Sequence, residues 1–267
     1  MKKILLSMAV MTTITTACTQ QKTLVLYYSQ TGTTQIVAEE LQKQLGADIE
    51  RIEAITPYDG DFQATIQRGG EELRSGEVPA INPIQANLAD YDVIFIGYPI
   101  WFGTYAMPIA TLVKENDFAG KTIVPFCTFG SGGLNSSTDA LRKALPQADI
   151  RQGYGVRTAR VAAVAKELDR FLIENGYKAG QVTPLPDYSE QQPVTKADSI
   201  LFDAACSNYQ FPLGTPLTVG KRETEESTDY KFTVQSRGMN GEETTSTIYV
   251  TVGKEDGATP EFTEVVR

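Results

Sequence analysis

The sequence contains no histidine. Hydrolases that activate a serine or cysteine nucleophile with histidine are therefore excluded, as are metal sites built on imidazole ligands. Its three cysteines, Cys18, Cys127 and Cys206, lie far apart and form no Cys-x-x-Cys pair. This spacing indicates neither a zinc site nor a disulfide framework, but it leaves a single Cys127–Cys206 bridge open. We expect no metal site, and we nominate no side chain as a catalytic acid, base or nucleophile.

Positive charge is also scarce. The chain has 24 Lys and Arg against 33 Asp and Glu, a formal net charge of −9, and no basic run of the kind that binds nucleic acid. Such an acidic surface repels nucleic acid and anionic membrane surfaces and favours basic partners. Hydrophobic residues make up 41% of the chain, which is enough to bury the core of one large or two ordinary domains.

Residues 1–18 are typical of an export signal. Lys2 and Lys3 precede an apolar stretch, Ile4 to Ile14, that is too short to remain as a membrane span. Small residues then lead to Cys18, so the segment resembles a bacterial lipoprotein signal that ends at a lipidated cysteine. An ordinary cleaved signal followed by an incidental cysteine is the alternative. We expect an exported, periplasm-facing lipoprotein that contacts the membrane only through its lipid.

Apolar runs alternate with amphipathic stretches along the next part of the chain. Five runs predict strands, at Thr23–Tyr28, Asp48–Glu53, Asp92–Gly97, Lys121–Cys127 and Asp149–Val156. Five stretches with helical spacing predict helices, at Thr33–Leu45, Phe62–Arg74, Pro108–Lys114, Ser137–Ala144 and Ala159–Glu174. This alternation predicts an α/β fold, a doubly wound, five-stranded parallel sheet covered on both faces. Such sheets bind ligands beyond the carboxyl ends of their strands.

The composition changes after this alternating part. Residues 181–193 are rich in proline and glutamine and predict a linker. Residues 194–267 predict a small α+β domain. In it, Thr195-x-x-Asp198 resembles a capping box before a helix, and alternating runs on either side of Asn240-Gly241 predict an antiparallel hairpin. A unit of about 75 residues has a marginal core, so we expect it to dock on the first domain.

Three loops that follow predicted strands contain the candidate site. The first lies between the first strand and the first helix and consists of Ser29, Gln30, Thr31, Gly32, Thr33 and Thr34. Backbone N–H groups, hydroxyls and the helix dipole favour an anion there. The loop has no lysine, which suits a phosphate monoester that is retained rather than a phosphoryl group that is transferred. A Ser/Thr-rich helix cap without a ligand is the alternative.

Residues 28–34, YSQTGTT, resemble the flavodoxin phosphate loop, whose pattern is Ser/Thr-x-Thr-Gly-x-Thr. The second loop, GYPIWFGT at 97–104, and the third, TFGSGG at 128–133, follow the strands after which flavodoxins hold the flavin ring. The chain is therefore similar to the flavodoxin family over residues 22–178, and the resemblance does not reach residues 181–267. It implies that FMN binds with its phosphate on residues 29–34.

The resemblance also implies that Trp101 stacks on the ring and that the second and third loops meet the ring's polar edge. A core or interface aromatic is the alternative for Trp101, and we expect Cys127 to be a core residue rather than a redox-active one. The residues concerned are Pro99, Ile100, Trp101, Phe102, Gly103, Thr104, Thr128, Phe129, Gly130, Ser131, Gly132 and Gly133.

The resemblance implies a flavodoxin-like electron-transfer protein whose partner is a redox protein or a small quinone. An NAD(P)H-dependent FMN quinone reductase is the alternative, although no separate glycine motif for a pyrophosphate is present. A scaffold that has lost its flavin is a third possibility, and the intact loops argue against it. Because the first two loops contain no Lys or Arg, we expect reduced FMN to be held more weakly than oxidised FMN.

Overall fold

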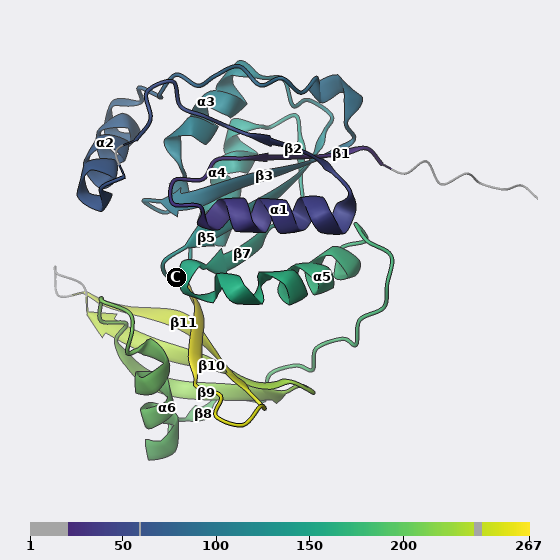
Figure 1. Cartoon of the computed structure of the whole chain (residues 1–267). Helices are drawn as coiled ribbons and strands as arrows, with labels where there is room; N and C mark the ends of the chain where they lie inside the picture. Colours follow the sequence, from purple (N-terminus) through teal and green to yellow (C-terminus); the bar gives the residue numbers. More distant parts are fainter. Residues whose placement is uncertain (1–20, 59, 238–241) are drawn as a thin grey trace, which may run out of the picture.

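Two β-sheets organise the protein (Figure 1). The computed structural model describes residues 21–58, 60–237 and 242–267, so the predicted signal segment and Cys18 lie outside the described residues. The first sheet has the order β2-β1-β3-β5-β6, with β7 also paired to β5 and the short β4 antiparallel to β3. Its strands are β1 (Thr23–Tyr27), β2 (Asp48–Arg51), β3 (Val93–Trp101), β4 (Thr104–Tyr105), β5 (Thr122–Phe129), β6 (Asp149–Ile150) and β7 (Tyr154–Arg157).

Helices cover both faces of the first sheet. The helices are α1 (Thr33–Leu45), α2 (Phe62–Ser75), α3 (Met107–Glu115), α4 (Leu134–Ala144) and α5 (Val164–Glu174). α1 and α5 pack on one face, and α3 and α4 on the other, with α2 beside α3. The continuous apolar runs of β1, β3 and β5 are buried between these layers because both faces are covered. The predicted doubly wound parallel sheet is confirmed.

The prediction of one fifth strand at Asp149–Val156 is wrong, because the strand is divided into β6 and β7. The interruption lies opposite Pro125 of β5. The Ile123 carbonyl accepts a hydrogen bond from the Arg151 N–H at 2.9 Å, so the backbone groups of Ile123 face β6. Backbone groups alternate between the two sides of a strand, so those of Pro125, two residues further along β5, face the same way. Proline has no N–H to donate, so the pairing is interrupted at this point and resumes beyond it, where β7 pairs with Phe126–Phe129 of β5.

The predicted helix Ala159–Glu174 also begins differently, as the 3-10 helix η2 (Thr158–Ala163) that leads into α5. Another short 3-10 helix, η1 (Leu88–Asp90), precedes β3. The Cys127–Cys206 bridge left open above is not formed, because both cysteines are free thiols. Cys127 is a fully buried core residue, as predicted, and burial raises the pKa of its thiol well above the ordinary value.

The second sheet is antiparallel, with the order β12-β11-β10-β9-β8. Its strands are β8 (Gln192–Pro193), β9 (Thr215–Glu223), β10 (Ser227–Arg237), β11 (Glu243–Gly253) and β12 (Glu261–Val266). α6 (Lys196–Cys206) begins at the predicted capping box and packs Phe202 against Phe232 of the sheet. The predicted β10–β11 pairing is confirmed, while the turn at Asn240-Gly241 lies outside the described residues. β9 and β12 were not predicted.

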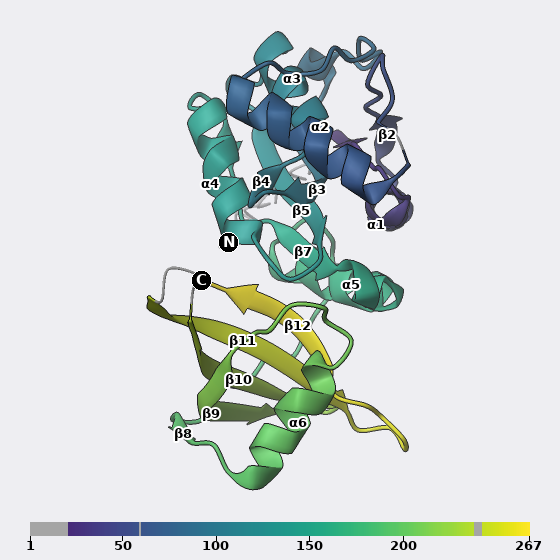
Figure 2. The same cartoon turned by 90° about the vertical axis from the view of Figure 1, so that its left-hand side faces the viewer.

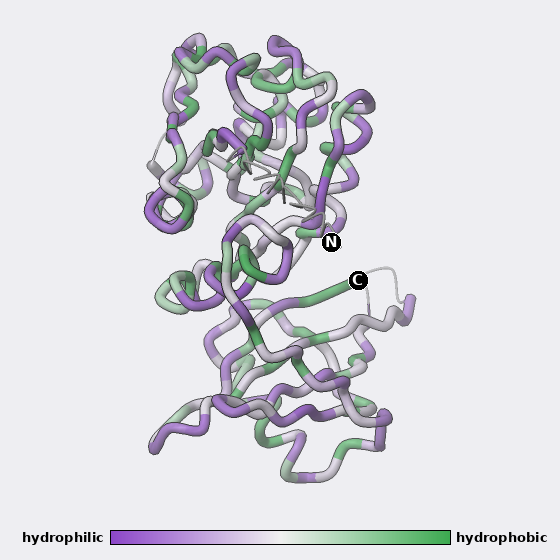
Figure 3. The backbone as a smooth tube through the Cα atoms, turned by 90° about the vertical axis from the view of Figure 1, so that its right-hand side faces the viewer, coloured by the Kyte–Doolittle hydropathy of each residue, from purple (hydrophilic) through white to green (hydrophobic). Residues whose placement is uncertain are grey.

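The second unit meets the first through β12. Figure 2 shows β12 on the side of the second sheet that faces the first unit, and its contacts there include β7. The end of β12 is one of the hydrophobic segments in Figure 3. Among the helices in the described ranges, none has the length and hydrophobicity needed to cross a bilayer.

Candidate functional site

The three candidate loops lie together at the carboxyl edge of the first sheet. Parallel strands end at the same edge, so the loops after β1, β3 and β5 become neighbours. The hydroxyls of Thr34 and Thr128 lie 2.8 Å apart, which joins the first loop to the third. The Ser136 hydroxyl, just after the third loop, donates to the Gly103 carbonyl in the second loop at 2.7 Å. Residues more than ninety positions apart therefore form one site.

The first loop presents hydrogen-bond donors at the start of α1. The buried Ser29 hydroxyl accepts a hydrogen bond from the Gln35 N–H at 3.3 Å, which fixes the turn into the helix. In the described part of the chain, the N–H groups of residues 31–34 have no hydrogen-bond partner. The hydroxyls of Thr31 and Thr33 lie 3.4 Å apart beside them. This arrangement can bind an anion through neutral donors.

Arg51, at the end of β2, adds a positive charge to the first loop. Its guanidinium donates to the Ser29 carbonyl at 3.0 Å and to the Gln35 side chain at 3.3 Å. Arg51 was not predicted, because it follows the loop by about twenty positions in the sequence and belongs to β2. Its only signal is the parallel register, which sets Arg51 opposite Tyr27. An anion bound by this loop would therefore lie near a positive charge that the loop sequence itself lacks.

The aromatic pair of the second loop is divided between core and surface. Trp101 is only 9% exposed and makes edge-to-face contacts with Tyr28 and Tyr58, at centroid distances of 5.8 and 5.0 Å. Phe102 is 46% exposed and has a φ of 52°, a left-handed conformation that is rare for a bulky residue. Strain of this kind is concentrated at binding sites. Stacking of Trp101 on a ring stays a prediction, and Phe102 offers the larger free aromatic surface.

The third loop is attached to the second unit. Phe129 is buried and contributes to the lining of the pocket described below. The Ser131 carbonyl accepts a hydrogen bond from the Val265 N–H of β12 at 2.7 Å. No sequence pattern indicated this contact, because β12 was not predicted and lies more than a hundred residues downstream.

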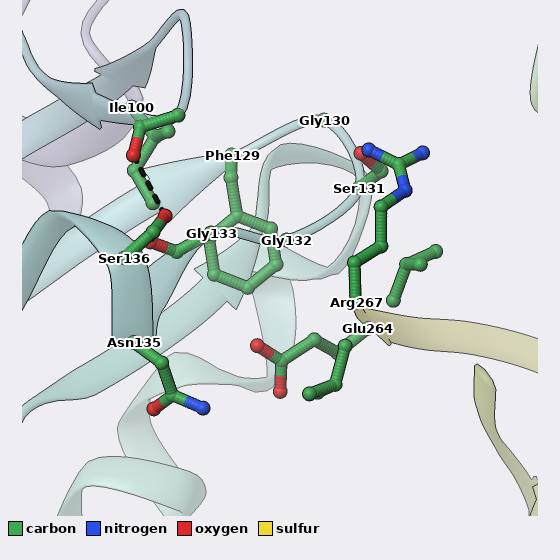
Figure 4. Close-up of a pocket in the computed structure, with 13 residues that line it drawn as sticks. Ile100, Phe129, Gly130, Ser131, Gly132, Gly133, Asn135, Ser136, Glu264 and Arg267 are labelled. Carbon is green, nitrogen blue, oxygen red and sulfur yellow. Dashed lines mark hydrogen bonds between the residues drawn. The ribbon is translucent and has the colours of Figure 1, made fainter. Parts of the chain in front are cut away.

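A pocket of about 340 Å³ lies between the second loop, the third loop and β12 (Figure 4). From the predicted site it contains Ile100, Gly103 and residues 129–133, whereas the first loop, Trp101 and Phe102 do not line it. Its other lining residues, which the sequence analysis missed, are Asn135, Ser136, Glu264, Val265, Val266 and Arg267. Within the described ranges, no three acidic, cysteine or histidine side chains gather into a possible metal site.

Comparison with known proteins gives the same picture for the first unit. The model of the family described as Flavodoxin matches residues 22–170, more than half of the chain. A candidate flavoprotein from Bacteroides uniformis ATCC 8492 is 31% identical, with a TM-score of 0.51, over 56% of this chain and 98% of that one. No curated protein matches the sequence.

Two further solved structures are similar over the same share of the chain. A candidate flavoprotein from Bacteroides eggerthii DSM 20697 is 32% identical, with a TM-score of 0.48, over 56% of this chain and 98% of that one. A flavoprotein from Lactobacillus acidophilus NCFM, solved in complex with FMN, is 21% identical, with a TM-score of 0.49, over 56% and 97% of the two chains. The family match, together with the loops at the edge of a doubly wound sheet, shows that this chain belongs to the flavodoxin family.

Proposed function

We propose that the chain is an electron-transfer protein that exchanges electrons between FMN and a redox partner protein or a small quinone. FMN is the cofactor of the flavodoxin family, to which the chain belongs. The observation that carries the proposal is the junction of three loops at one sheet edge, with Thr34 and Thr128 in hydrogen-bond contact. The match to the Bacteroides uniformis candidate flavoprotein supports it.

The residues present fit the phosphate of FMN. The unpartnered N–H groups of residues 31–34 lie at the N-terminus of a 13-residue helix, where the helix dipole favours an anion. The hydroxyls of Thr31 and Thr33 add neutral donors, and Arg51 adds a cation behind the loop. These groups would hold the phosphate and fix the position of the cofactor along the sheet edge.

The second and third loops fit the ring. They border a pocket whose lining combines apolar groups with backbone amides, as ring-binding sites require. Bound FMN supplies the reversible electron transfer, and the chain supplies orientation and electrostatics. The chain's own residues bind the phosphate, limit the access of water on the side of β12 and set the charge around the ring.

The first experiment measures flavin in the purified protein. We expect a flavin spectrum and acid-released FMN in near-equimolar amount, while FAD in the extract would contradict the cofactor assignment. Thr31→Asp and Thr33→Asp should each weaken FMN binding at least about tenfold, because a carboxylate would then face the phosphate. Thr31→Asn and Thr33→Asn are the neutral controls. Normal flavin content in both Asp variants would reject the loop assignment.

An assay of NAD(P)H oxidation with a quinone separates the electron carrier from a quinone reductase. We expect no turnover above that of free FMN. Sustained NAD(P)H-dependent turnover would replace the carrier by the reductase.

We also propose that the protein is exported and anchored to a bacterial membrane, facing the periplasm, by lipid on Cys18. The support is the pattern of residues 1–18, a short apolar stretch that ends at a cysteine. Cys18→Ala should release the protein from the membrane fraction without loss of bound FMN. A variant that still sediments with membranes would contradict the anchor.

A further inference from the structure

Strand β12 of the second unit packs directly against the third loop. The Val265 N–H donates a hydrogen bond to the Ser131 carbonyl, the kind of backbone contact that joins neighbouring strands. A side-chain Cβ at Gly132 would lie 2.2 Å from the Val265 carbonyl oxygen, far closer than such atoms approach. The close approach of β12 therefore requires a glycine at position 132 of the third loop.

Arg157, at the end of β7, also joins the third loop to β12. Its side chain is buried and donates to the Gly130 carbonyl at 2.8 Å and to the Phe262 carbonyl at 2.7 Å. Its guanidinium also lies over the Phe262 ring, 3.9 Å from the centroid. One arginine thus bonds the third loop and β12 simultaneously, while Arg160 and Glu261 form an ion pair beside it. Charge-assisted hydrogen bonds and an ion pair therefore hold β12 in a defined position beside the third loop.

The same strand brings a carboxylate to the pocket. Figure 4 shows Glu264 on β12, with its carboxylate directed into the pocket that the second and third loops border. In the residues that the structure describes, this carboxylate has no hydrogen-bond or ion-pair partner. Burial raises the pKa of Glu264, so the charge is costly where it lies. A partly buried carboxylate without a partner is seldom kept for stability alone.

The charged and titratable neighbours of Glu264 do not neutralise it. Cys127 of β5 and Tyr249 of β11 lie near it, and burial raises the pKa of both, so they remain uncharged at neutral pH. Arg267 lines the same pocket but forms no ion pair with it in the described structure. Glu264 is therefore the acidic group that the second unit presents to the pocket.

We propose that the second unit is a working part of the cofactor site: β12 forms one wall of the ring pocket, and the Glu264 carboxylate on it makes the site discriminate against reduced FMN. This inference rests on the proposed function, because it takes the ring to lie between the second and third loops. Reduction adds negative charge to the ring, so a nearby carboxylate disfavours the reduced cofactor more than the oxidised one. Glu264 is a group that sets affinity and potential, and no chemical step is assigned to it.

The test compares Glu264→Gln with the wild type as full-length proteins. Each is titrated with oxidised FMN and, without oxygen, with dithionite-reduced FMN, and the ratio of the two dissociation constants is taken. Glu264→Gln should strengthen the binding of reduced FMN about tenfold relative to oxidised FMN. Glu264→Asp, which keeps the charge, should retain the wild-type order of affinities.

Glu225→Gln is the matched control. It removes the same charge from an exposed position of the second unit that does not line the pocket, so the ratio should not change. An equal ratio in wild type and Glu264→Gln, with oxidised FMN bound by both, would overturn this inference and leave the proposed function standing. Failure of the wild type to bind oxidised FMN would overturn the proposed function, and this inference with it.

Discussion

The hydroxyl groups of Thr34 and Thr128 lie 2.8 Å apart although 94 residues separate them in the sequence. Thr34 is in the first turn of α1 and Thr128 is near the end of β5, and both are buried. The contact therefore fixes the distance between the first loop and the third loop before a ligand is present.

Thr34→Val and Thr128→Val should each destabilise the protein by about 1–3 kcal/mol, because each leaves a buried hydroxyl without its partner. The double variant should cost less than the sum of the two, with a coupling of about 0.5–1.5 kcal/mol. Urea unfolding of the four proteins in the double-mutant cycle measures this. Additive effects would mean that the two hydroxyls do not interact.

Trp101→Ala and Phe102→Ala should separate core packing from ligand contact. Trp101 is 9% exposed, so its truncation should cost about 3–5 kcal/mol of stability, whereas truncation of the exposed Phe102 should cost little. If Trp101 also stacks on the ring, its loss weakens FMN by about 1–3 kcal/mol. Unfolding curves and FMN titrations, followed by flavin fluorescence, measure both effects. Weaker FMN binding by Phe102→Ala alone would move the stacking role to Phe102.

Gly132→Ala and Gly130→Ala form a matched pair in the third loop. A methyl group at Gly132 would lie 2.2 Å from the Val265 carbonyl oxygen, whereas at Gly130 no atom lies within 4 Å. Gly132→Ala should therefore destabilise the protein by about 1–3 kcal/mol and speed amide hydrogen exchange at Val265. Gly130→Ala should change stability by less than about 0.5 kcal/mol. Equal behaviour of the two variants would contradict the contact between the third loop and β12.

Glu264→Gln should change the pH dependence of stability. Burial raises the pKa of Glu264 in the folded state, so the folded protein loses stability as the pH rises through that pKa and the carboxyl ionises. The Gln variant cannot ionise. It should therefore be more stable than the wild type at pH 8 and equally stable below about pH 4, where both side chains are neutral. Urea midpoints at the two pH values measure this, and a less stable variant at pH 8 would show that the carboxylate has a stabilising partner.

The first unit could be predicted from the sequence because its signals are local. Continuous apolar runs predicted β1, β3 and β5, and the stop at Gly46 marked the end of α1, which has the predicted bounds Thr33–Leu45. The break between β6 and β7 could not be predicted in this way. It depends on Pro125 in the neighbouring strand β5, and the sequence of residues 149–156 does not show which strand they pair with.

The candidate site shows the same difference between local and long-range signals. The first loop, with its TGTT sequence, could be proposed as an anion site from the sequence because its donors are consecutive residues. Arg51, Arg157 and Glu264 were missed, because each reaches the site from an element whose place is set by long-range pairing. β12 itself is short and carries two glutamates among its apolar residues, so its periodicity is weak.

The bond between Val265 and Ser131 also bears on the order in which the protein acquires its structure. The parallel sheet and the first loop lie within residues 21–178, whereas the third loop has β12 as its neighbour only after residues 261–266 have folded into the second sheet. Closing so long a segment is slow compared with local folding. A newly made chain should thus pass through a stage in which the first sheet has formed while the side of the pocket that β12 lines is still open.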